Sequence, residues 1–209
     1  MDGALLPVKS PARAKSRLAD RFSDAVRADI AWALLEDALT LCVSAPFLEW
    51  WVVSDDAEVL RRARARGLQT LLDAGTGLND AVRLGVAHIR TRGAQSVTIV
   101  PADVPLAYRG DLIDLLDTGA TSDLVVVPSR SDGGTNGLYL SPPDVIAPRF
   151  GPGSLRAHVE LAEKRGLRCS ILTLPRLELD IDTVEDVDAF LAARRPVATR
   201  TSALLERLA

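Results

Sequence analysis

The sequence predicts an α/β protein with a mostly parallel central sheet and helices on both faces. Two observations predict this fold class. Short apolar runs alternate with segments whose apolar residues recur at helical spacing, which is the pattern of strand–helix–strand units. The unusual polar residues also follow the expected strands, and ligands of parallel α/β sheets bind beyond the carboxyl ends of the strands. The fold class therefore also indicates where a site should lie.

In the first half of the chain, helix-boundary residues separate the apolar runs. Ser23 and Asp24 suit the N-cap of a long helix, and Pro46 stops the chain soon after its end. Gly67 ends the next helical pattern. We expect, in order, strand 3–8, helix 23–44, strand 48–54, helix 57–67, strand 68–73, helix 78–93 and strand 96–100.

In the second half, the stretch LELDID at 177–182 is the most unusual. Apolar residues alternate there with three acids, which indicates a strand with one apolar and one acidic face. Thr183 and Asp186 form a capping-box pattern, so a final helix should follow directly. We expect, in order, helix 110–119, strand 122–129, a glycine-rich turn at 130–137, strand 138–142, helix 153–166, strand 168–175, strand 177–182 and the last helix.

Length and composition fit one globular domain over residues 1–209. Of the 209 residues, 47% are hydrophobic and 25% are charged, which is enough apolar matter for a sizeable core. The net charge of −3 argues against nucleic acid or an anionic membrane as a partner. The N-terminus lacks the features of a signal peptide and no apolar run reaches the ~18 residues of a membrane span, so we expect a cytoplasmic protein. The Arg-rich tail 194–209 is expected to be loosely held, and Trp50 with Trp51 fits either the core or a homodimer interface.

Three acids follow strands and are candidates for a metal site. Asp103 lies in the loop PADVP, where flanking prolines fix the direction of the carboxylate, and Asp180 and Asp182 close strand 177–182. If the three carboxylates converge, they form a hard oxygen site that suits Mg²⁺. A divalent cation would also relieve the repulsion between acids at i and i+2. Taken singly, each acid has an alternative explanation as a helix cap or a turn residue.

The loop PVKSPARAKSRL, residues 7–18, follows the first strand and gathers cations. It lacks the GxxxxGK[ST] of a P-loop and the GxGxxG of a dinucleotide site. Lys9, Lys15 and Arg17 can still supply charge-assisted hydrogen bonds to a polyphosphate. Two of the three lysines of this arginine-rich chain lie here, which favours a need for ammonium groups. The alternative is an ordinary solvated loop in which chance placed the lysines.

Two glycine-rich stretches offer donors for a small anion. In DGGTNG, residues 132–137, the backbone can approach a ligand closely and Thr135 can donate a hydrogen bond. RFGPGS brings Gly151 and Ser154 to a helix N-terminus, which favours an anion. The alternatives are a plain hairpin turn and an N-cap at Ser154. His158, one turn further along that helix, either reaches the same anion or is a half-exposed packing residue, and we favour packing.

Cations for a polyphosphate, acids for Mg²⁺ and a separate anion site together indicate nucleotidyl transfer. A phosphate or carboxylate acceptor would attack a nucleoside triphosphate, and pyrophosphate would leave. The protein would contribute positioning and charge neutralisation. No Ser-His-Asp or Cys-His arrangement in the sequence indicates a covalent nucleophile.

These residues lie in motifs that resemble the 2-phospho-L-lactate guanylyltransferase family, which includes the phosphoenolpyruvate and 3-phosphoglycerate guanylyltransferases of coenzyme F-420 biosynthesis. The resemblance extends over about residues 5–190 and is carried, in order, by PVKSPARAKSRL, GLNDAV, PADVP, GGTNGL, RFGPGS and DIDTVEDV. It implies a Rossmann-like nucleotidyltransferase fold and the transfer of GMP from GTP to a phosphorylated three-carbon acid.

The resemblance also implies roles for individual residues. Mg²⁺ would be bound by Asp103, Asp180 and Asp182, and the acid by Thr135, Gly151 and Ser154. The nucleotide would be bound by Lys9, Lys15 and Asn79, and the catalytic set would be Lys9, Lys15, Arg17 and Asp103. Asn79 has an alternative as the N-cap of its helix.

Two other functions remain compatible with these residues. A nucleotidyltransferase for a sugar phosphate or molybdopterin would keep the fold, but RFGPGS offers no aromatic platform for a sugar or pterin ring. A non-catalytic nucleotide-binding module would not need all three acids. The sequence leaves open which phosphorylated acid is preferred, because the three differ by only a few atoms.

Overall fold

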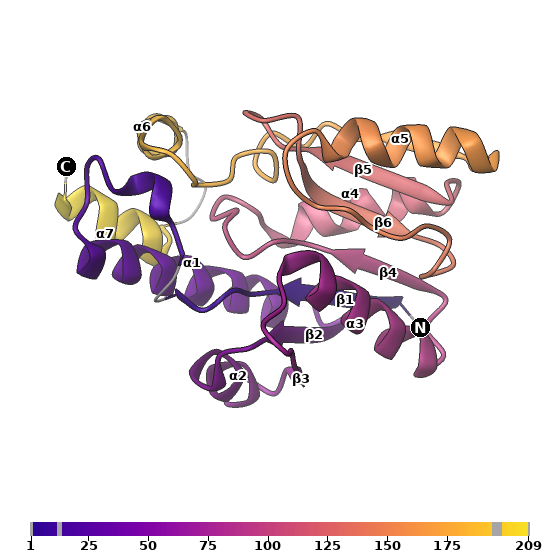
Figure 1. The fold of residues 1–209 in the computed structure, drawn as a ribbon, viewed down its shortest axis with the longest axis horizontal. Coiled ribbons are helices and arrows are strands. Elements are labelled where there is room, and N and C mark those ends of the chain that lie inside the picture. Colours follow the sequence, from indigo (N-terminus) through magenta and orange to yellow (C-terminus); the bar gives the residue numbers. More distant parts are fainter. Residues whose placement is uncertain (1, 12–13, 194–197, 209) are drawn as a thin grey trace.

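The computed structural model describes residues 2–11, 14–193 and 198–208, and a seven-stranded sheet forms its centre (Figure 1). The strand order is β3-β2-β1-β4-β6-β5-β7. Strand β6 runs antiparallel to β4 and β5, and the other neighbours pair in parallel, so the predicted mostly parallel sheet is confirmed. The strands are β1 (Asp2–Pro7), β2 (Glu49–Ser54), β3 (Gln69–Leu72), β4 (Ser96–Ile99), β5 (Leu124–Pro128), β6 (Thr135–Leu140) and β7 (Cys169–Ile171).

Two helices, α1 and α6, begin where the capping residues of the sequence place them. The Ser23 side chain accepts a hydrogen bond from the backbone of Val26, and Thr183 and Asp186 form the predicted capping box. The helices are α1 (Asp24–Ser44), α2 (Ala57–Arg64), α3 (Leu78–Thr91), α4 (Arg109–Gly119), α5 (Ser154–Arg165), α6 (Val184–Ala192) and α7 (Arg200–Leu208), with a 3₁₀ turn η2 (Ser16–Leu18). Among the described residues, none of these helices has the length and apolar character needed to cross a bilayer.

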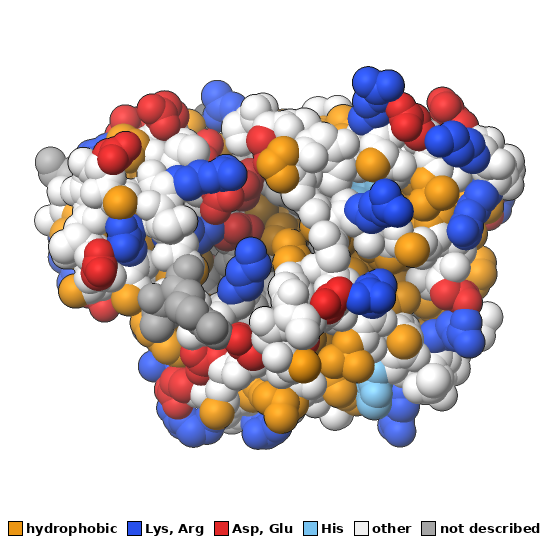
Figure 2. Space-filling model, viewed as in Figure 1, with side chains coloured by type: hydrophobic (Ala, Val, Ile, Leu, Met, Phe, Trp, Pro, Cys, Tyr) orange, Lys and Arg blue, Asp and Glu red, His pale blue; other side chains and the backbone are white. Residues whose placement is uncertain are grey.

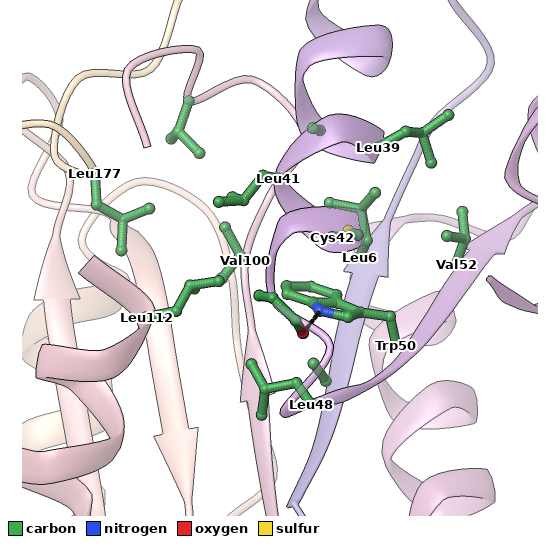
Figure 3. Close-up of a cluster of buried hydrophobic side chains, with 14 of the residues drawn as sticks. Leu6, Leu39, Leu41, Cys42, Leu48, Trp50, Val52, Val100, Leu112 and Leu177 are labelled. Atoms are coloured by element: carbon green, nitrogen blue, oxygen red, sulfur yellow. Dashed lines mark hydrogen bonds between the residues drawn. The ribbon is translucent and has the colours of Figure 1, made fainter. Parts of the chain in front are cut away.

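Both faces of the sheet are covered by helices. Alternate residues of β1 point to opposite faces, with Leu6 packing in a cluster with α1, α2 and α4, and Leu5 in a cluster with α3 and α5. Trp50 and Trp51 divide in the same way, and each is buried within the chain's own core. Figure 3 shows Trp50 donating its indole N–H to the backbone oxygen of Ala45, 3.2 Å away. Of the two alternatives for this pair, the core is therefore correct.

The C-terminal segment is not the loosely held tail that the sequence predicted. Helix α7 packs against α1, and the Asp37 carboxylate on α1 accepts hydrogen bonds from the backbone N–H groups of Arg200 and Thr201, at 2.8 and 2.9 Å. The first turn of a helix leaves such donors without intrahelical partners, so Asp37 acts as its cap. Leu205 is buried in a cluster with residues of α1 and α6. Residues 194–197 and 209 of the expected tail lie outside the described residues.

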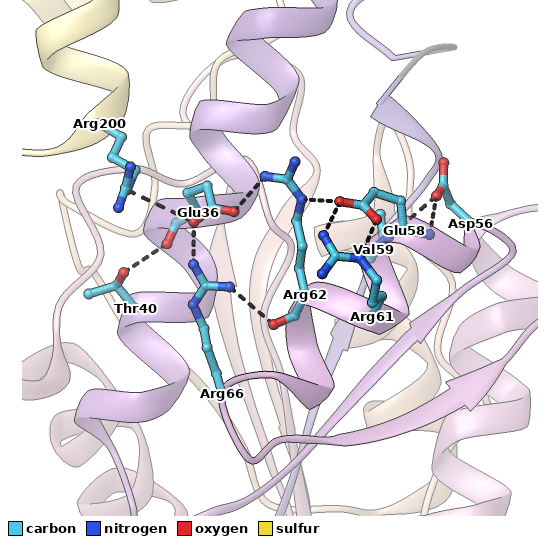
Figure 4. A network of polar contacts seen from close by, with 9 residues as sticks. All are labelled: Glu36, Thr40, Asp56, Glu58, Val59, Arg61, Arg62, Arg66 and Arg200. Atoms are coloured by element: carbon cyan, nitrogen blue, oxygen red, sulfur yellow. Dashed lines mark hydrogen bonds and ion pairs between the residues drawn. The ribbon is translucent and has the colours of Figure 1, made fainter.

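A polar network centred on Glu36 of α1 joins this helix to α7 and to the α2 region. Figure 4 shows the Glu36 carboxylate between Arg62, Arg66 and Arg200. The Arg62 guanidinium lies 2.8 Å from a Glu36 oxygen, and the Glu36 side chain is only 12% exposed. Charges that are removed from water need several donors to offset desolvation, and this carboxylate has them.

The expected strand at 177–182 is wrong, although its two faces were identified correctly. Leu177, Leu179 and Ile181 are buried and the three acids between them are partly exposed. The segment is extended, but its backbone forms isolated hydrogen bonds, from Arg130 N to Glu178 O and from Ile181 N to Asp103 O, and no ladder. Conversely, residues 135–137 of the expected glycine-rich turn belong to β6.

Candidate active site

The topology brings the ends of distant strands together beside β1. This strand lies between β2 and β4 and is parallel to both, so the carboxyl ends of β1 and β4 are neighbours at the point where the connections diverge. Such a switch in strand order opens a crevice in α/β sheets. The cationic loop follows β1, and Asp103 follows β4.

Three carboxylates converge at this point. One oxygen from each of Asp103, Asp180 and Asp182 lies within 4.8 Å of the other two. Two features of the extended segment cause the convergence. The Ile181 N–H donates to the Asp103 backbone oxygen at 3.0 Å, which ties the two segments together. Burial of the flanking apolar residues then turns both acids of the segment toward the same side.

The environments of Asp180 and Asp182 differ. Asp180 accepts hydrogen bonds from neutral donors, the Asn136 amide at 2.8 Å and the Ser129 hydroxyl at 3.1 Å. Burial and the repulsion of Asp103 raise the pKa of Asp180 to about 6. Burial alone would also raise the pKa of Asp182, but the nearby Lys15 ammonium lowers it below its ordinary value.

Lys15 occupies the centre of this acidic group. Its ammonium lies 2.8 Å from both Asp103 Oδ2 and Asp182 Oδ1, and its side chain is only 8% exposed. Burial would lower the pKa of Lys15, but attraction to the two carboxylates outweighs it and the pKa is raised. Lys15 has a backbone φ of 58° and is the only non-glycine residue in the left-handed region among the described residues. An uncommon backbone conformation therefore directs its side chain toward the carboxylates. In this structure Lys15 therefore contacts carboxylates.

A cavity of about 420 Å³ opens beside the carboxylates. Its lining includes Lys9 and Arg17 of the cationic loop and, from a separate segment of the chain, Gly151. Figure 2 shows acidic and basic side chains around a hollow near the middle of this face, with hydrophobic side chains at its floor. The charges of Arg17 and Lys9 also contribute to lowering the pKa of Asp182, so the loop faces the acids electrostatically. Ala12 and Arg13 of this loop lie outside the described residues.

The segments expected to bind the acid are in contact with one another. Thr135 begins β6 and Ser154 begins α5, and the Ser154 hydroxyl donates to Thr135 Oγ1 at 3.0 Å. Both side chains are buried, and among the described residues that line the cavity there is Gly151 but neither of these two. Gly153 is the N-cap of α5, so the expected alternative of a cap at Ser154 is wrong.

The N-terminus of α5 is not the open anion site that the glycines suggested. The N–H groups of Gly153 and Leu155 donate to the backbone oxygens of Asp132 and Gly133, at 3.2 and 3.1 Å. The Ser154 N–H donates to the Gly151 oxygen. The turn at 132–134 therefore satisfies donors that an incoming anion would otherwise meet.

Comparison with known proteins decides the family. The model of the guanylyl transferase CofC-like family matches residues 3–200. The chain belongs to this family. It is 38% identical to the phosphoenolpyruvate guanylyltransferase of Conexibacter woesei, over 98% of this chain and 95% of that protein. It is 34% identical to the 3-phospho-D-glycerate guanylyltransferase of Phenylobacterium zucineum, over 100% and 97% of the two chains.

Solved structures agree on the fold of this CofC-like chain. A Desulfovibrio desulfuricans protein, provisionally described as a nucleotide-diphospho-sugar transferase, matches with a TM-score of 0.81 over 99% of this chain and 94% of that one, at 18% identity. A nucleotidyl transferase from a Methanothermobacter species matches with a TM-score of 0.64 over 91% and 95%, at 15% identity. At these identities the match shows the nucleotidyltransferase fold, which confirms the predicted fold class.

Two polar residues of the CofC-like chain have partners that the sequence did not predict. Asn79 is neither the N-cap of α3, which is Gly77, nor free at the cavity. Its amide binds both backbone groups of Phe150, accepting from N–H at 2.7 Å and donating to the oxygen at 3.1 Å. His158 is 1% exposed, so the expected half-exposed packing residue is wrong. Local sequence carries no signal for the Asn79–Phe150 pair, because its members are 71 residues apart in the chain.

Proposed function

We propose that this protein transfers GMP from GTP to a small phosphorylated acid and releases pyrophosphate, in the biosynthesis of coenzyme F-420. The observation that carries the proposal is the carboxylate group with a cationic loop across one cavity, in a chain of the CofC-like family. The curated relatives support the substrate class, because they are named for phosphoenolpyruvate, 3-phospho-D-glycerate or 2-phospho-L-lactate.

Mg²⁺ is the metal that we propose for Asp103, Asp180 and Asp182. The donor set fits, because the three carboxylates converge and supply the oxygen ligands that Mg²⁺ prefers. Mg²⁺ bound there would supply charge neutralisation at the phosphates that react. Asn136 and Ser129 hold Asp180 in place, and Lys15 holds the other two acids.

The cationic loop would bind the triphosphate. Lys9 and Arg17 line the cavity, and charge-assisted hydrogen bonds from these groups suit phosphate oxygens. A second cavity of about 210 Å³ shares Lys9 and Leu78 with the first and is lined by Asp55 and Asp73. A carboxylate accepts hydrogen bonds, and guanine offers an N–H and an amino group on one edge, so we place the base there. Asn79 follows Leu78 at the start of α3, which is consistent with the expected place near the nucleotide, although its amide is bound to the Phe150 backbone.

The acid would lie at Gly151, with Thr135 and Ser154 behind it. An oxygen of its phosphate would attack the α-phosphorus of GTP, forming a new P–O bond while the bond to the leaving pyrophosphate breaks. The chain would orient the two substrates and hold the catalytic set of Lys9, Lys15, Arg17 and Asp103 around the reacting phosphates. No covalent bond to the protein is needed.

A pyrophosphate-release assay tests this function. Purified protein with Mg²⁺ and GTP would be given each of the three acids singly, with ATP as the nucleotide control. We expect release with GTP and at least one of the acids, and its loss in the Asp103→Asn variant with the fold retained. Release with none of the acids would contradict the proposed substrate class.

A further inference from the structure

His158 lies buried among the three segments that carry the proposed acid-binding residues. Its Nδ1 is 3.1 Å from Thr135 Oγ1, at the start of β6. Its Nε2 is 3.0 Å from the backbone nitrogen of Arg149, two residues before Gly151. The ring itself stands one turn after Ser154 on α5. One imidazole therefore joins the strand, the loop and the helix of this site.

The hydrogen-bond directions in this group follow from one fixed donor. The Arg149 N–H can only donate, so His158 Nε2 accepts and the ring is neutral with its proton on Nδ1. The Nδ1–H then donates to Thr135 Oγ1, which also accepts from the Ser154 hydroxyl at 3.0 Å. Thr135 thus receives two hydrogen bonds, and its own hydroxyl proton is left to donate elsewhere. A hydroxyl held as a donor suits an anionic oxygen.

The surroundings keep the ring in this neutral state. His158 is 1% exposed, and burial lowers its pKa to about 4. The Phe150 ring packs edge-on against the imidazole, with 5.9 Å between ring centroids. The Phe150 backbone is in turn held by both ends of the Asn79 amide. The loop before Gly151 is therefore bound from two sides.

From these contacts we propose that His158 is the positioning residue of the acid site: it fixes the loop that carries Gly151, which lines the cavity, and it orients the buried Thr135 hydroxyl at the start of β6. This inference rests on the proposed function. It assigns no contact between His158 and substrate, and it concerns the acid and not GTP, because the contacts of the imidazole lead to the segments of the acid site.

Two substitutions separate the two contacts of the ring. In His158→Asn, the side-chain amide reaches the position of Nδ1 and can still donate to Thr135, but it loses the Arg149 N–H. In His158→Gln, the longer side chain places an oxygen near the position of Nε2 and can accept from Arg149, but it loses Thr135. The matched control is Ala162→Gly, a buried position one turn further along α5 that loosens the helix without touching the polar group.

The test is steady-state kinetics of pyrophosphate release with the acid that the wild type uses best. We expect the KM for the acid to rise at least tenfold in both His158 variants, with the KM for GTP within about twofold of the wild type and the KM values of Ala162→Gly unchanged. Melting temperatures would show that each variant is folded.

Two results would overturn the inference. If the wild type turns over the acid but the His158 variants behave like Ala162→Gly, with both KM values unchanged, His158 is only a core residue and the proposed function stands. If the wild type turns over none of the acids, the proposed function fails and the inference fails with it.

Discussion

Replacing Asp180 with asparagine should stabilise the protein in EDTA while abolishing its activity. Asp180 is a largely buried carboxylate next to two others, and the donors that reach it, from Asn136 and Ser129, are neutral. Asparagine has the same shape and can accept both hydrogen bonds through its side-chain oxygen. The variant therefore removes a repelled charge and keeps its contacts.

The magnitude follows from the pKa of Asp180, which burial raises from an ordinary 3.8 to about 6. At about 1.4 kcal/mol per pH unit, ionising this group at pH 7 costs the folded state at most about 3 kcal/mol. Because the side chain retains some contact with water, we expect about 1–2 kcal/mol, which is a rise in melting temperature of about 3–6 °C for a chain of this size.

The dependence on pH distinguishes this cause from ordinary repacking. Because the folded-state pKa of Asp180 is raised, the folded protein holds its proton more tightly than the unfolded chain does. The free energy of unfolding of the wild type should therefore fall as the pH rises from about 4 to about 6. The variant, which has no ionisable group at this position, should not show this fall. Thermal unfolding in EDTA from pH 4 to 8 measures the difference, which should be near zero at pH 4 and complete above pH 7.

Asp182→Asn is the matched control, and its effect should have the opposite sign. Lys15 lowers the pKa of Asp182, so this acid stabilises the folded protein above its ordinary pKa and loses that contribution as the pH falls. The control should lower the melting temperature near neutral pH. A lower melting temperature for Asp180→Asn at pH 7, or an offset that does not change with pH, would refute the electrostatic account.

Three further predictions follow from other contacts. Lys15→Met should lower kcat/KM by about 10²-fold and also lower the melting temperature in EDTA, because Asp103 and Asp182 lose their buried counter-charge. Steady-state kinetics and thermal melts measure these two effects, and unchanged values would contradict the prediction. Asp73→Asn should raise the KM for GTP about tenfold or more and reduce the preference for GTP over ATP, as competition assays would show, if the second cavity holds guanine. Asp37→Ala should reduce the free energy of unfolding by about 1–2 kcal/mol in chemical denaturation with kcat unchanged, because it removes the cap of α7, and neither Asp37 nor the described part of α7 lines the cavity. A loss of activity without a loss of stability would contradict this.

Most helices and strands could be predicted because their signals are local. Ser23 and Thr183 cap their helices by bonding to residues three positions on, and the apolar periodicity of a helix or strand is contained in the element itself. The segment 177–182 shows the limit of such signals. Its alternation reports which side chains are buried, and that part was correct. Whether an extended segment forms a ladder depends on its neighbours, and here they supply only isolated hydrogen bonds.

Helix α7 could not be predicted, because its stabilising partners are distant. Asp37 and Glu36 are more than 160 residues before Arg200 in the sequence, and they supply the cap and part of the charge network. The same reason applies to the site. The fold rule that places ligands at carboxyl strand ends was enough to bring Asp103 and Lys15 to one region. The fold rule gave no information on which group each side chain contacts. These contacts depend on positions within a few ångströms in the folded chain.

The charges at the carboxylate group support a divalent cation over a monovalent one. Asp103, Asp180 and Asp182 together carry −3 when all are ionised, and Lys15, bonded to two of them, contributes +1. Among these bonded groups a charge of −2 remains, and one divalent cation neutralises it; Lys9 and Arg17 of the cationic loop are not bonded to the acids and are not counted here. Asp180 is the acid most affected by the excess negative charge, because it has no bonded cation and its pKa is raised. The pKa of Asp182, in contrast, is lowered by Lys15. Without Lys15 the three acids would repel one another more strongly, and with a second lysine bonded to them they would have little charge left for a metal. A single bonded ammonium therefore suits the proposed metal site.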